Sequence, residues 1–378
     1  MKILVAPDSF KGSITAAEFC AITQNAIHAL RPDIVVRSLP MADGGEGTTE
    51  ALLAGLGGEK ISCQVTGPMR QKVTAFFGYC ERDKLAFMEM ASASGLPLVP
   101  PATRNPLLAT SYGTGELLIH ALERGAERII LGIGGSATND GGFGMLEALG
   151  FGFFDEQGSA LPPGPVSLKK LARMDSSSVH PQLHHCHIQV ACDVTNPLLG
   201  PLGASHVYGP QKGATPTMIA ELEQALTHFA DCVEGLTQKR FRDHPGAGAA
   251  GGLGFALLSL CRAEIKSGFD LIADLHRLPQ RLSDEGYDWL ITGEGRIDEQ
   301  SLHGKLLSRV TELAEQYNIP VLAFCGALTL DPVALKNCHI FPIIPEPCSL
   351  ERALTEAPHF LYQTIQRVLA LILSSRLS

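Results

Sequence analysis

The sequence predicts an α/β fold with two domains, one of them a doubly wound parallel-sheet domain built from both ends of the chain. Short apolar runs that fit buried strands alternate with segments of helical periodicity, an order typical of α/β proteins. A chain of 378 residues is too long for one ordinary core. The alternation is regular at both termini and changes in the middle. We therefore expect residues 1–66 and 285–378 to form one domain and residues 67–284 to form an inserted second α/β domain.

The N-terminal segment begins with a strand, a helix, a second strand and a second helix. Residues 2–6 fit a buried strand, and Thr15 with Glu18 forms a capping box after it. Apolar residues then recur at helical spacing. We expect the second strand over residues 34–39 and the second helix over residues 47–56.

The middle of the chain has a different rhythm. Three short strand-like runs lie close together and predict a mixed or antiparallel sheet: 61–66, 73–79 and 85–90. The next expected elements are a helix over 113–123, a strand over 128–133, a helix over 142–149, and strands over 151–155 and 188–192. Thr215 followed by Pro216 predicts the start of a long helix. Another helix is expected over residues 249–261.

The C-terminal part returns to regular alternation. The expected strands are 289–291, 321–325 and 340–344, and the expected helices are 306–317 and 360–373. This return of the rhythm is the reason for assigning both chain ends to one domain.

Composition excludes several classes of partner. The 30 Lys and Arg against 39 Asp and Glu residues give a net charge of −9, without a long basic run. This disfavours binding to nucleic acid or to an anionic membrane surface. No apolar run approaches the roughly 20 residues of a membrane span, and no signal peptide is visible. The ten cysteines form no CxxC motif and are expected to be reduced thiols. We therefore expect a cytoplasmic protein.

The loop after the first strand is the first candidate binding segment. Asp8, Ser9, Lys11 and Ser13 stand between this strand and the following helix. Open α/β sheets bind ligands at the carboxyl ends of their strands, and helix N-termini attract anions. The loop therefore predicts an anion site, and the alternative is a capped turn with a surface lysine.

A second group of charged residues follows the strand at 289–291. Glu294 and Asp298 supply two carboxylates that suit Mg²⁺ or its water shell, and Arg296 supplies a cation. Lys305, at the start of the next helix, offers another cation near the same strand end. Each of these side chains also fits an ordinary surface turn.

The loop over residues 132–142 is the densest in glycine. Its successive backbone N–H groups can form an anion-binding nest that includes Gly134, Gly135, Ser136 and Asn139. An alternative is a dinucleotide site. Gly132, Gly134 and Ala137 match GxGxxA, and Asp155 ends the next expected strand. That interpretation would make the protein an NAD-dependent dehydrogenase.

The strand at 188–192 is followed by a candidate general base. Asp193 stands at a strand end, with Asn196 nearby, and the alternative is an Asx turn. Lys212 lies in a glycine-flanked loop. Gly248 belongs to a glycine-rich segment that no strand precedes, so close packing and phosphate contact remain equally open there.

Together these loops resemble the bacterial glycerate kinase family. The segments that carry the resemblance run in order over most of the chain: APDSFKGS (6–13), MADGGEGT (41–48), MASASGL (90–96), TSYGTGEL (110–117), GIGGSATNDGG (132–142), ACDVTNPLLG (191–200), YGPQKGA (208–214), PGAGAAGGLG (245–254) and ITGEGRID (291–298). The resemblance implies ATP- and Mg²⁺-dependent phosphorylation of D-glycerate, chiefly at the 2-hydroxyl, with the 3-hydroxyl as the alternative.

Phosphoryl transfer depends on positioning and charge neutralisation more than on covalent chemistry. We expect Asp193, Lys11 and Asp8 to be catalytic, and Glu294 and Asp298 to bind the metal. The expected substrate- and phosphate-binding residues are Ser9, Ser13, Gly134, Gly135, Ser136, Asn139, Asn196, Lys212, Gly248, Arg296 and Lys305. A dehydrogenase and a non-catalytic metabolite-binding protein remain as alternatives, and homo-oligomerisation is left open.

Overall fold

The computed structural model describes residues 1–302, 306–329 and 337–375, and the chain forms two compact α/β units. The first unit comprises residues 1–43, 50–57 and 269–378, and the second comprises residues 44–49 and 58–268. Parallel sheets with connecting helices occur in both, so the predicted fold class is confirmed.

The units divide the chain at other residues than the expected bounds. Strand β3 (Glu59–Thr66) pairs antiparallel with β4 (Lys72–Cys80) along its whole length and so belongs to the second unit. Residues 269–284, which contain most of α9 (Gly268–Leu275) and all of α10 (Leu278–Asp284), belong to the first unit. A strand belongs to the unit that contains the strand with which it pairs. The residues of the strand itself do not predict this pairing.

The first unit contains a five-stranded parallel sheet in the order β13-β12-β11-β1-β2. Its strands are β1 (Lys2–Val5), β2 (Val35–Ser38), β11 (Trp289–Ile297), β12 (Val321–Leu328) and β13 (Cys338–Pro342). The chain proceeds from β1 to β2 on one side and from β11 to β12 on the other. The boundary between β1 and β11 is therefore a topological switch point, where open α/β sheets bind ligands.

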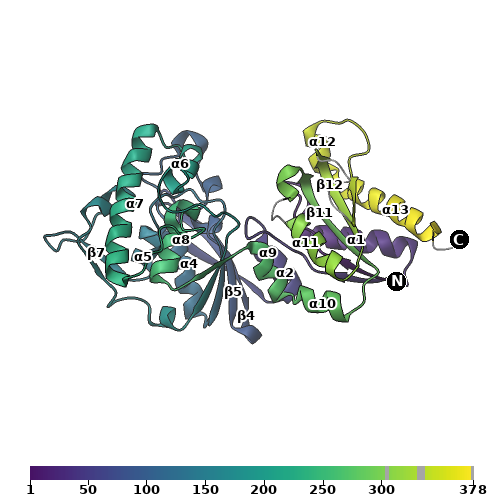
Figure 1. Ribbon diagram of the computed structural model, residues 1–378, viewed down its shortest axis with the longest axis horizontal. Coiled ribbons are helices and arrows are strands. Elements are labelled where there is room, and N and C mark those ends of the chain that lie inside the picture. The colour runs from purple at the N-terminus through teal and green to yellow at the C-terminus, as the bar shows by residue number, and fades with distance from the viewer. Residues whose placement is uncertain (303–305, 330–336, 376–378) are drawn as a thin grey trace. The chain divides into compact units, whose positions relative to one another are not determined.

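The helices of the first unit are α1 (Ala16–Leu30), most of α2 (Thr48–Leu56), α9, α10, α11 (Leu306–Gln316), α12 (Leu350–Thr355) and α13 (Ala357–Ser375). The predicted capping box starts α1: Thr15 Oγ1 accepts from the Glu18 N–H at 3.1 Å, and Glu18 Oε2 accepts from the Thr15 N–H at 2.8 Å. Helices α1 and α13 lie side by side (Figure 1) and bury Ile3 and Val5 beneath them.

The second unit contains a six-stranded sheet in the order β10-β9-β6-β5-β4-β3. Its remaining strands are β5 (Leu85–Glu89), β6 (Arg128–Gly132), β9 (His187–Ala191) and β10 (Glu264–Lys266). Strands β3, β4 and β5 are antiparallel, whereas β5, β6, β9 and β10 are parallel. The mixed sheet predicted for the middle of the chain is thus present.

The helices of this unit are α3 (Ala91–Ser94), α4 (Tyr112–Glu123), α5 (Phe143–Ala148), α6 (Ala204–Tyr208), α7 (Pro216–Thr237) and α8 (Ala249–Leu260). Helix α7 begins as predicted, because Thr215 Oγ1 accepts from the Met218 N–H at 3.3 Å. Leu222, Leu226 and Phe229 of α7 are fully buried, so its apolar stripe belongs to the core.

The dehydrogenase interpretation requires the strand before Asp155 to lie beside β6 in the parallel sheet, and this is wrong. Strand β7 (Gly152–Phe154) pairs with β8 (Arg173–Asp175) in a separate two-stranded antiparallel sheet. The neighbours of β6 are β5 and β9. Asp155 Oδ1 instead accepts from the N–H groups of Gln157 and Ser159, at 3.0 and 2.9 Å, as in a tight turn. Asp155 therefore does not stand at the end of a neighbouring parallel strand.

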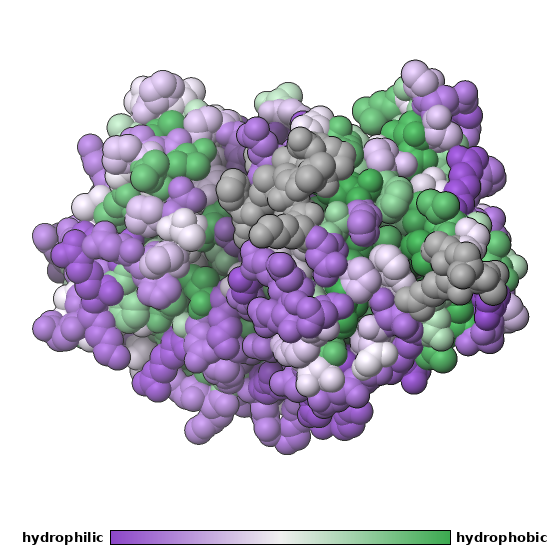
Figure 2. All heavy atoms as spheres, turned by 45° about the vertical axis from the view of Figure 1, so that its right-hand side comes forward, coloured by the Kyte–Doolittle hydropathy of each residue, from purple (hydrophilic) through white to green (hydrophobic). Residues whose placement is uncertain are grey.

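Surface and thiol features agree with the composition. Within the described ranges, no helix combines the length and apolarity needed to cross a membrane. Figure 2 shows a face on which hydrophobic residues are interspersed with hydrophilic ones. All ten cysteines are free thiols, as predicted.

Candidate active site

Charged side chains gather at the switch point of the first unit. The Asp8 N–H donates to the Gly293 carbonyl at 2.9 Å, which places the residue after β1 directly beside β11. Lys11 Nζ lies 4.0 Å from Asp43 Oδ2, and both side chains are solvent-accessible. Asp8 also interacts electrostatically with Glu294. The structure thus brings together Asp8, Lys11 and Glu294, three of the predicted site residues.

The Asp8 carboxyl is held in an unfavourable environment for a negative charge. It is 8% exposed, and burial, followed by repulsion from Asp43, raises its pKa from 3.8 to about 7. The Ser9 N–H, 2.7 Å from Oδ1, and the Lys11 ammonium oppose this shift. A cation bound beside Asp8 would favour its ionised form.

Asp8→Asn should stabilise the first unit at neutral and alkaline pH. In the wild type the folded state binds more protons than the unfolded chain between about pH 4 and pH 7, so stability falls as the pH rises through this window. Asparagine does not titrate and keeps an acceptor for the Ser9 N–H. The melting temperature of Asp8→Asn relative to wild type should therefore rise by a few degrees between pH 5 and pH 8, without nucleotide or divalent cations. Asp284→Asn, at an exposed carboxylate of α10, is the control. An equal offset at both pH values would contradict the prediction.

The two predicted metal ligands do not form one site. Strand β11 extends to Ile297, so Glu294 lies within the strand instead of in a loop after it. At about 3.3 Å per residue, the backbones of Glu294 and Asp298 are roughly 13 Å apart. Asp298 Oδ2 pairs with Arg296 Nε at 3.1 Å, so this arginine is also engaged locally. In the described part of the chain, no group of three His, Cys, Asp or Glu side chains is arranged to hold a metal.

Three further predicted binding residues are Ser9, Ser13 and Lys305. Ser13 Oγ donates to the Phe10 carbonyl at 3.0 Å and so stabilises its own turn. Ser9 is half-buried next to Asp8, and its N–H binds that carboxylate. Lys305 lies outside the described residues.

In the second unit, the segment at 44–49 packs against the carboxyl ends of the parallel strands. A Cβ atom at Gly132 would lie 2.4 Å from the Gly44 carbonyl oxygen, and one at Gly44 would lie 2.6 Å from Ala191 Cβ. Gly44 also has a φ of +85°, a conformation that favours glycine. Glycine is required at these positions because the last residues of β6 and β9, Gly132 and Ala191, lie too close to the segment for a side chain to fit between them.

Glu89 anchors this segment and was not predicted. It ends β5, is 7% exposed, and its Oε1 accepts from the Thr49 N–H at 2.8 Å. Its Oε2 accepts from the Gly47 N–H at 3.4 Å. A carboxylate at a helix N-terminus satisfies donors that the helix leaves unpaired. The available sequence signal was a single acidic residue at the end of the apolar run Leu85–Met88.

The glycine-rich loop after β6 is held by backbone hydrogen bonds and has backbone N–H groups that can bind a ligand. The Leu96 N–H donates to the Gly135 carbonyl at 2.8 Å, and the Ala137 N–H donates to the Ser94 carbonyl at 3.0 Å. Gly134 and Gly135 are exposed, and within the described ranges their own N–H groups donate no hydrogen bond. This part of the loop therefore suits the anion-binding role predicted for it.

Lys212 supports that loop from inside the protein. Its side chain is almost fully buried, and its Nζ donates to Ser136 Oγ at 2.8 Å and to the Thr138 carbonyl at 2.7 Å. Burial lowers the pKa of Lys212 to about 7, whereas the charge of Asp140 acts in the opposite direction. A lysine held in this way positions the loop and does not present its charge to a phosphate, contrary to the role expected for Lys212 and Ser136.

Lys212→Met should destabilise the protein and loosen the glycine-rich loop. Methionine keeps the unbranched shape but leaves the Thr138 carbonyl without its donor, at a cost of about 1–3 kcal/mol. We expect a melting temperature several degrees lower, because the loop loses its support. Lys170→Met, at an exposed lysine that ends the helical turn Pro165–Lys170, is the control. An unchanged melting temperature would contradict the supporting role of Lys212.

The two polar residues that follow this support are also internal. Asn139 is fully buried, and its Nδ2 donates to Ser205 Oγ at 3.0 Å. Asp140 accepts from both the N–H and the hydroxyl of Ser111, each at 2.8 Å, and from the Gly142 N–H at 3.2 Å. Asn139 therefore holds the loop in place instead of meeting a ligand from its exposed side, and Asp140 is unsuited to proton abstraction.

Asp193 follows β9 and is exposed, with its Oδ1 accepting from the Gly268 N–H at 2.9 Å. The Asn196 Nδ2 donates to the Leu202 carbonyl at 2.8 Å, and its Oδ1 accepts from the Tyr208 hydroxyl at 2.6 Å. Both groups of the Asn196 amide thus stabilise its own loop.

Gly248 is buried in the same region. Its N–H donates to the Asn196 carbonyl at 2.9 Å. A Cβ atom there would lie 2.1 Å from the Pro197 carbonyl oxygen, so close packing accounts for this glycine. Asn196 and Gly248 shape the loop that carries Asp193, instead of contacting phosphate as predicted.

Known proteins are similar to this chain over nearly its whole length. The family model described as the glycerate kinase family matches residues 3–373. The chain is 47% identical over 371 residues to a glycerate kinase of Haemophilus influenzae, covering 97% of this chain and 98% of that one. It is 46% identical over 357 residues to a glycerate 2-kinase of Escherichia coli, covering 93% of each chain.

A solved structure agrees with these sequence relatives. A crystal structure of a protein assigned as glycerate kinase 2 from Salmonella typhimurium LT2 matches with a TM-score of 0.91 and 46% identity, over 100% of both chains. A match of the family model along nearly the entire length, together with relatives of this identity, establishes the assignment. The chain belongs to the glycerate kinase family.

Proposed function

We propose that this protein transfers the γ-phosphoryl group of ATP to the 2-hydroxyl of D-glycerate and produces 2-phospho-D-glycerate. The observation that carries the proposal is the pairing of β6 with β9, in which Gly132 stands opposite Ala191. This register places the start of the glycine-rich loop beside the start of the Asp193 loop. A set of phosphate-binding donors and a carboxylate acceptor thus begin at neighbouring strand ends, as phosphoryl transfer requires.

Each group has a proposed role. The exposed N–H groups of Gly134 and Gly135 bind phosphate oxygens of ATP. Asp193 accepts the proton of the attacking hydroxyl, because it is the exposed carboxylate at that strand end. Lys11 neutralises negative charge on the glycerate carboxylate or on the transferring phosphate. Glu89 and Lys212 act indirectly, through the segment and the loop that they hold.

Magnesium fits the charge pattern of the first unit. A cation would offset the repulsion that, after burial, raises the pKa of Asp8 to about 7. Mg²⁺ is commonly bound by one or two carboxylates together with nucleotide phosphates, so an all-protein cage is not needed. Asp8 and Glu294 are the residues that would hold it. When bound, the ion would supply neutralisation of phosphate charge.

The direct test is an assay of purified protein with MgATP and D-glycerate. ADP formation that depends on glycerate supports the proposal, and ³¹P NMR of the product identifies the acceptor hydroxyl. A 3-phosphoglycerate product would overturn only the 2-position, for which the name of the E. coli relative is the main support. Absence of glycerate-dependent ADP would overturn the kinase proposal. A parallel incubation of glycerate with NAD⁺, followed by absorbance, covers the dehydrogenase alternative.

A further inference from the structure

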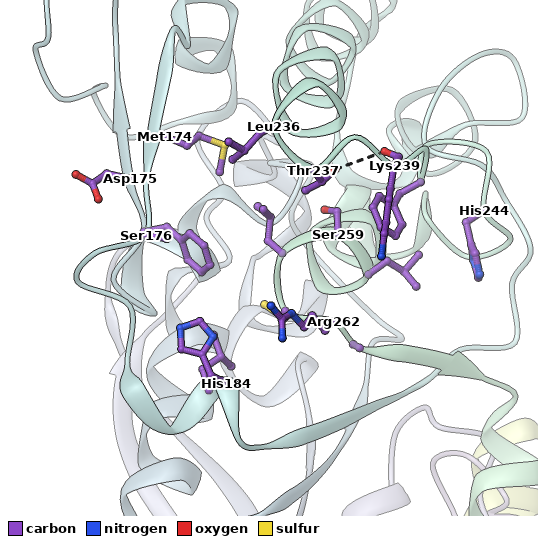
Figure 3. A pocket seen from close by; sticks show the side chains of 17 residues that line it. Met174, Asp175, Ser176, His184, Leu236, Thr237, Lys239, His244, Ser259 and Arg262 are labelled. Carbon is purple, nitrogen blue, oxygen red and sulfur yellow. Dashed lines mark hydrogen bonds between the residues drawn. The ribbon is translucent and has the colours of Figure 1, made fainter.

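A cavity lies in the second unit, toward the amino ends of β9 and β10. Its volume is about 600 Å³, within the range of small-molecule sites. It is bordered by the C-terminal ends of α7 and α8, by β8, and by the short helical turn Pro181–His184 that precedes β9 (Figure 3). The loops of the candidate active site stand at the opposite, carboxyl ends of the strands, so this cavity is separate from them.

The floor of the cavity is apolar. Phe151, Leu183, Leu258 and Ala263 line it, and all four are at least nine-tenths buried and belong to the core of the unit. At the mouth stands Leu236, which is 63% exposed although it is a large hydrophobic residue. A ligand that fills the cavity would therefore remove apolar surface from water and needs a hydrocarbon or aromatic body.

The rim of the cavity is basic. Figure 3 shows Arg262 between His184 and Lys239 at the edge of the cavity. In the described part of the chain, these three side chains form no hydrogen bond or ion pair, and all three residues are exposed. The lining includes one carboxylate, Asp175. It accepts from the Ser177 N–H at 2.9 Å and pairs with Arg173 at 3.3 Å, so its charge is already balanced.

From this combination we propose that the cavity binds a small organic carboxylate with an apolar body, and that its occupancy is felt at the glycine-rich loop through α8. An apolar floor without a charged rim would favour a neutral ligand. A basic rim without an apolar floor would favour a small inorganic anion. Both features together select an amphipathic monocarboxylate. Glycerate has hydroxyls in place of an apolar body and does not fit this description.

Helix α8 is the physical connection. Its C-terminal residues line the cavity, and its regular helical part, Leu253–Leu260, extends for about 12 Å. Before it, Ala250, Gly251 and Gly252 form a kink with positive φ angles. At its other end the Gly141 N–H donates to the Gly251 carbonyl at 3.0 Å. A Cβ atom at Gly251 would lie 2.1 Å from the Thr138 carbonyl oxygen, the same oxygen that Lys212 holds. A displacement of α8 that carries Gly251 with it would shift the backbone of the loop at Thr138 and Gly141.

Binding is tested with hexanoate and benzoate as probes, by calorimetry and thermal shift on the full-length protein. We expect saturable binding with a Kd on the order of 1 mM or tighter. Hexanol and acetate, which keep only the body or only the carboxylate, should bind much more weakly. Arg262→Gln should weaken hexanoate about five- to tenfold through loss of a charge-assisted hydrogen bond. Ser176→Trp should block the mouth. Arg240→Gln, at an exposed arginine outside the lining, should change nothing.

Three results would overturn the binding site: no saturation by either carboxylate, equal affinity for hexanol and hexanoate, or unchanged hexanoate affinity in both Arg262→Gln and Ser176→Trp. A concentration-dependent dimer, seen by light scattering and abolished by Leu236→Asp, would assign the surface to a second copy and would also overturn it.

The coupling rests on the proposed function and has its own test. If α8 connects the sites, saturating hexanoate should change the Kd of a non-hydrolysable ATP analogue by a factor of ~5. The saturating analogue should change the Kd of hexanoate by the same factor, because coupling between two sites is reciprocal. If neither ligand changes the Kd of the other, the coupling is overturned and the binding site is not. If no ADP forms from MgATP and D-glycerate when hexanoate and benzoate are absent, only the kinase proposal is overturned. Binding of hexanoate to the cavity is measured without turnover and does not depend on that result.

Discussion

Asp193→Asn should lower kcat by a factor of about 10²–10⁴, the usual contribution of a general base, with little change in the KM for ATP. Asparagine has nearly the same shape, and its amide oxygen still accepts from the Gly268 N–H that Asp193 Oδ1 binds at 2.9 Å. The loop should therefore keep its structure while the proton acceptor is lost. Because a base acts on the transition state, the loss should appear in kcat when both substrates are saturating.

Two comparisons make this result specific. Asp155→Asn changes another carboxylate that accepts from backbone N–H groups after a strand, and it should have near-normal turnover. Glu294→Gln, at a proposed Mg²⁺ ligand, should be rescued in part by excess Mg²⁺, whereas Asp193→Asn should not be. Rescue of Asp193→Asn by Mg²⁺, without rescue of Glu294→Gln, would show that the two roles are reversed.

Lys11→Ala should lower kcat/KM for glycerate by a factor of ~10² or more, in line with the loss of a group that stabilises developing charge. The Lys11 side chain is 68% exposed, and its contact with Asp43 is long, at 4.0 Å, so removal should have little effect on stability. Measurement of both substrate dependences, together with a thermal melt, checks the expectation.

The matched control is Lys72→Ala in the second unit. Lys72 has the same side-chain exposure, 68%, and an equally weak ion pair, 3.8 Å from Glu116. It should have near-normal kinetics, and Lys11→Arg should recover part of the lost activity because it restores the charge. If Lys11→Ala and Lys72→Ala behave alike, Lys11 is an ordinary surface lysine.

Several features of the site were readable from the sequence because their causes are local. The capping box of Thr15 and Glu18 requires only residues three apart and is present. The loop at 132–142 combines a strand, a run of glycines and a helix start, and these are consecutive in the chain. Asp8 and Lys11 were singled out because residues that follow a parallel strand lie at the sheet edge where ligands bind. Glu294 was expected in a loop after its strand, and it lies beside Asp8 from within β11.

Other roles depended on partners distant in sequence. Lys212 looked like an exposed cation because its loop is flanked by glycines, yet its Nζ is bound to Ser136 and Thr138, more than 70 residues earlier. Glu89 looked like part of an apolar strand, yet it holds the N–H groups of Gly47 and Thr49. Neither contact is encoded in the periodicity of the residues around it.

The order of residues was sufficient for the α/β class, for most of the longer strands and helices, and for the glycine-rich and charged loops at strand ends, since these follow from hydrophobic periodicity, capping and turn residues within short windows. The short elements β10, α9, α10 and α12 were not predicted. Strand partners, and with them the unit boundaries and the separation of β7 from β6, came from the folded chain. So did the difference between exposed Asp193 and buried Asp140. Hydrogen bonding between strands and the burial of a charge join residues far apart in the chain, so they are decided when the whole chain packs.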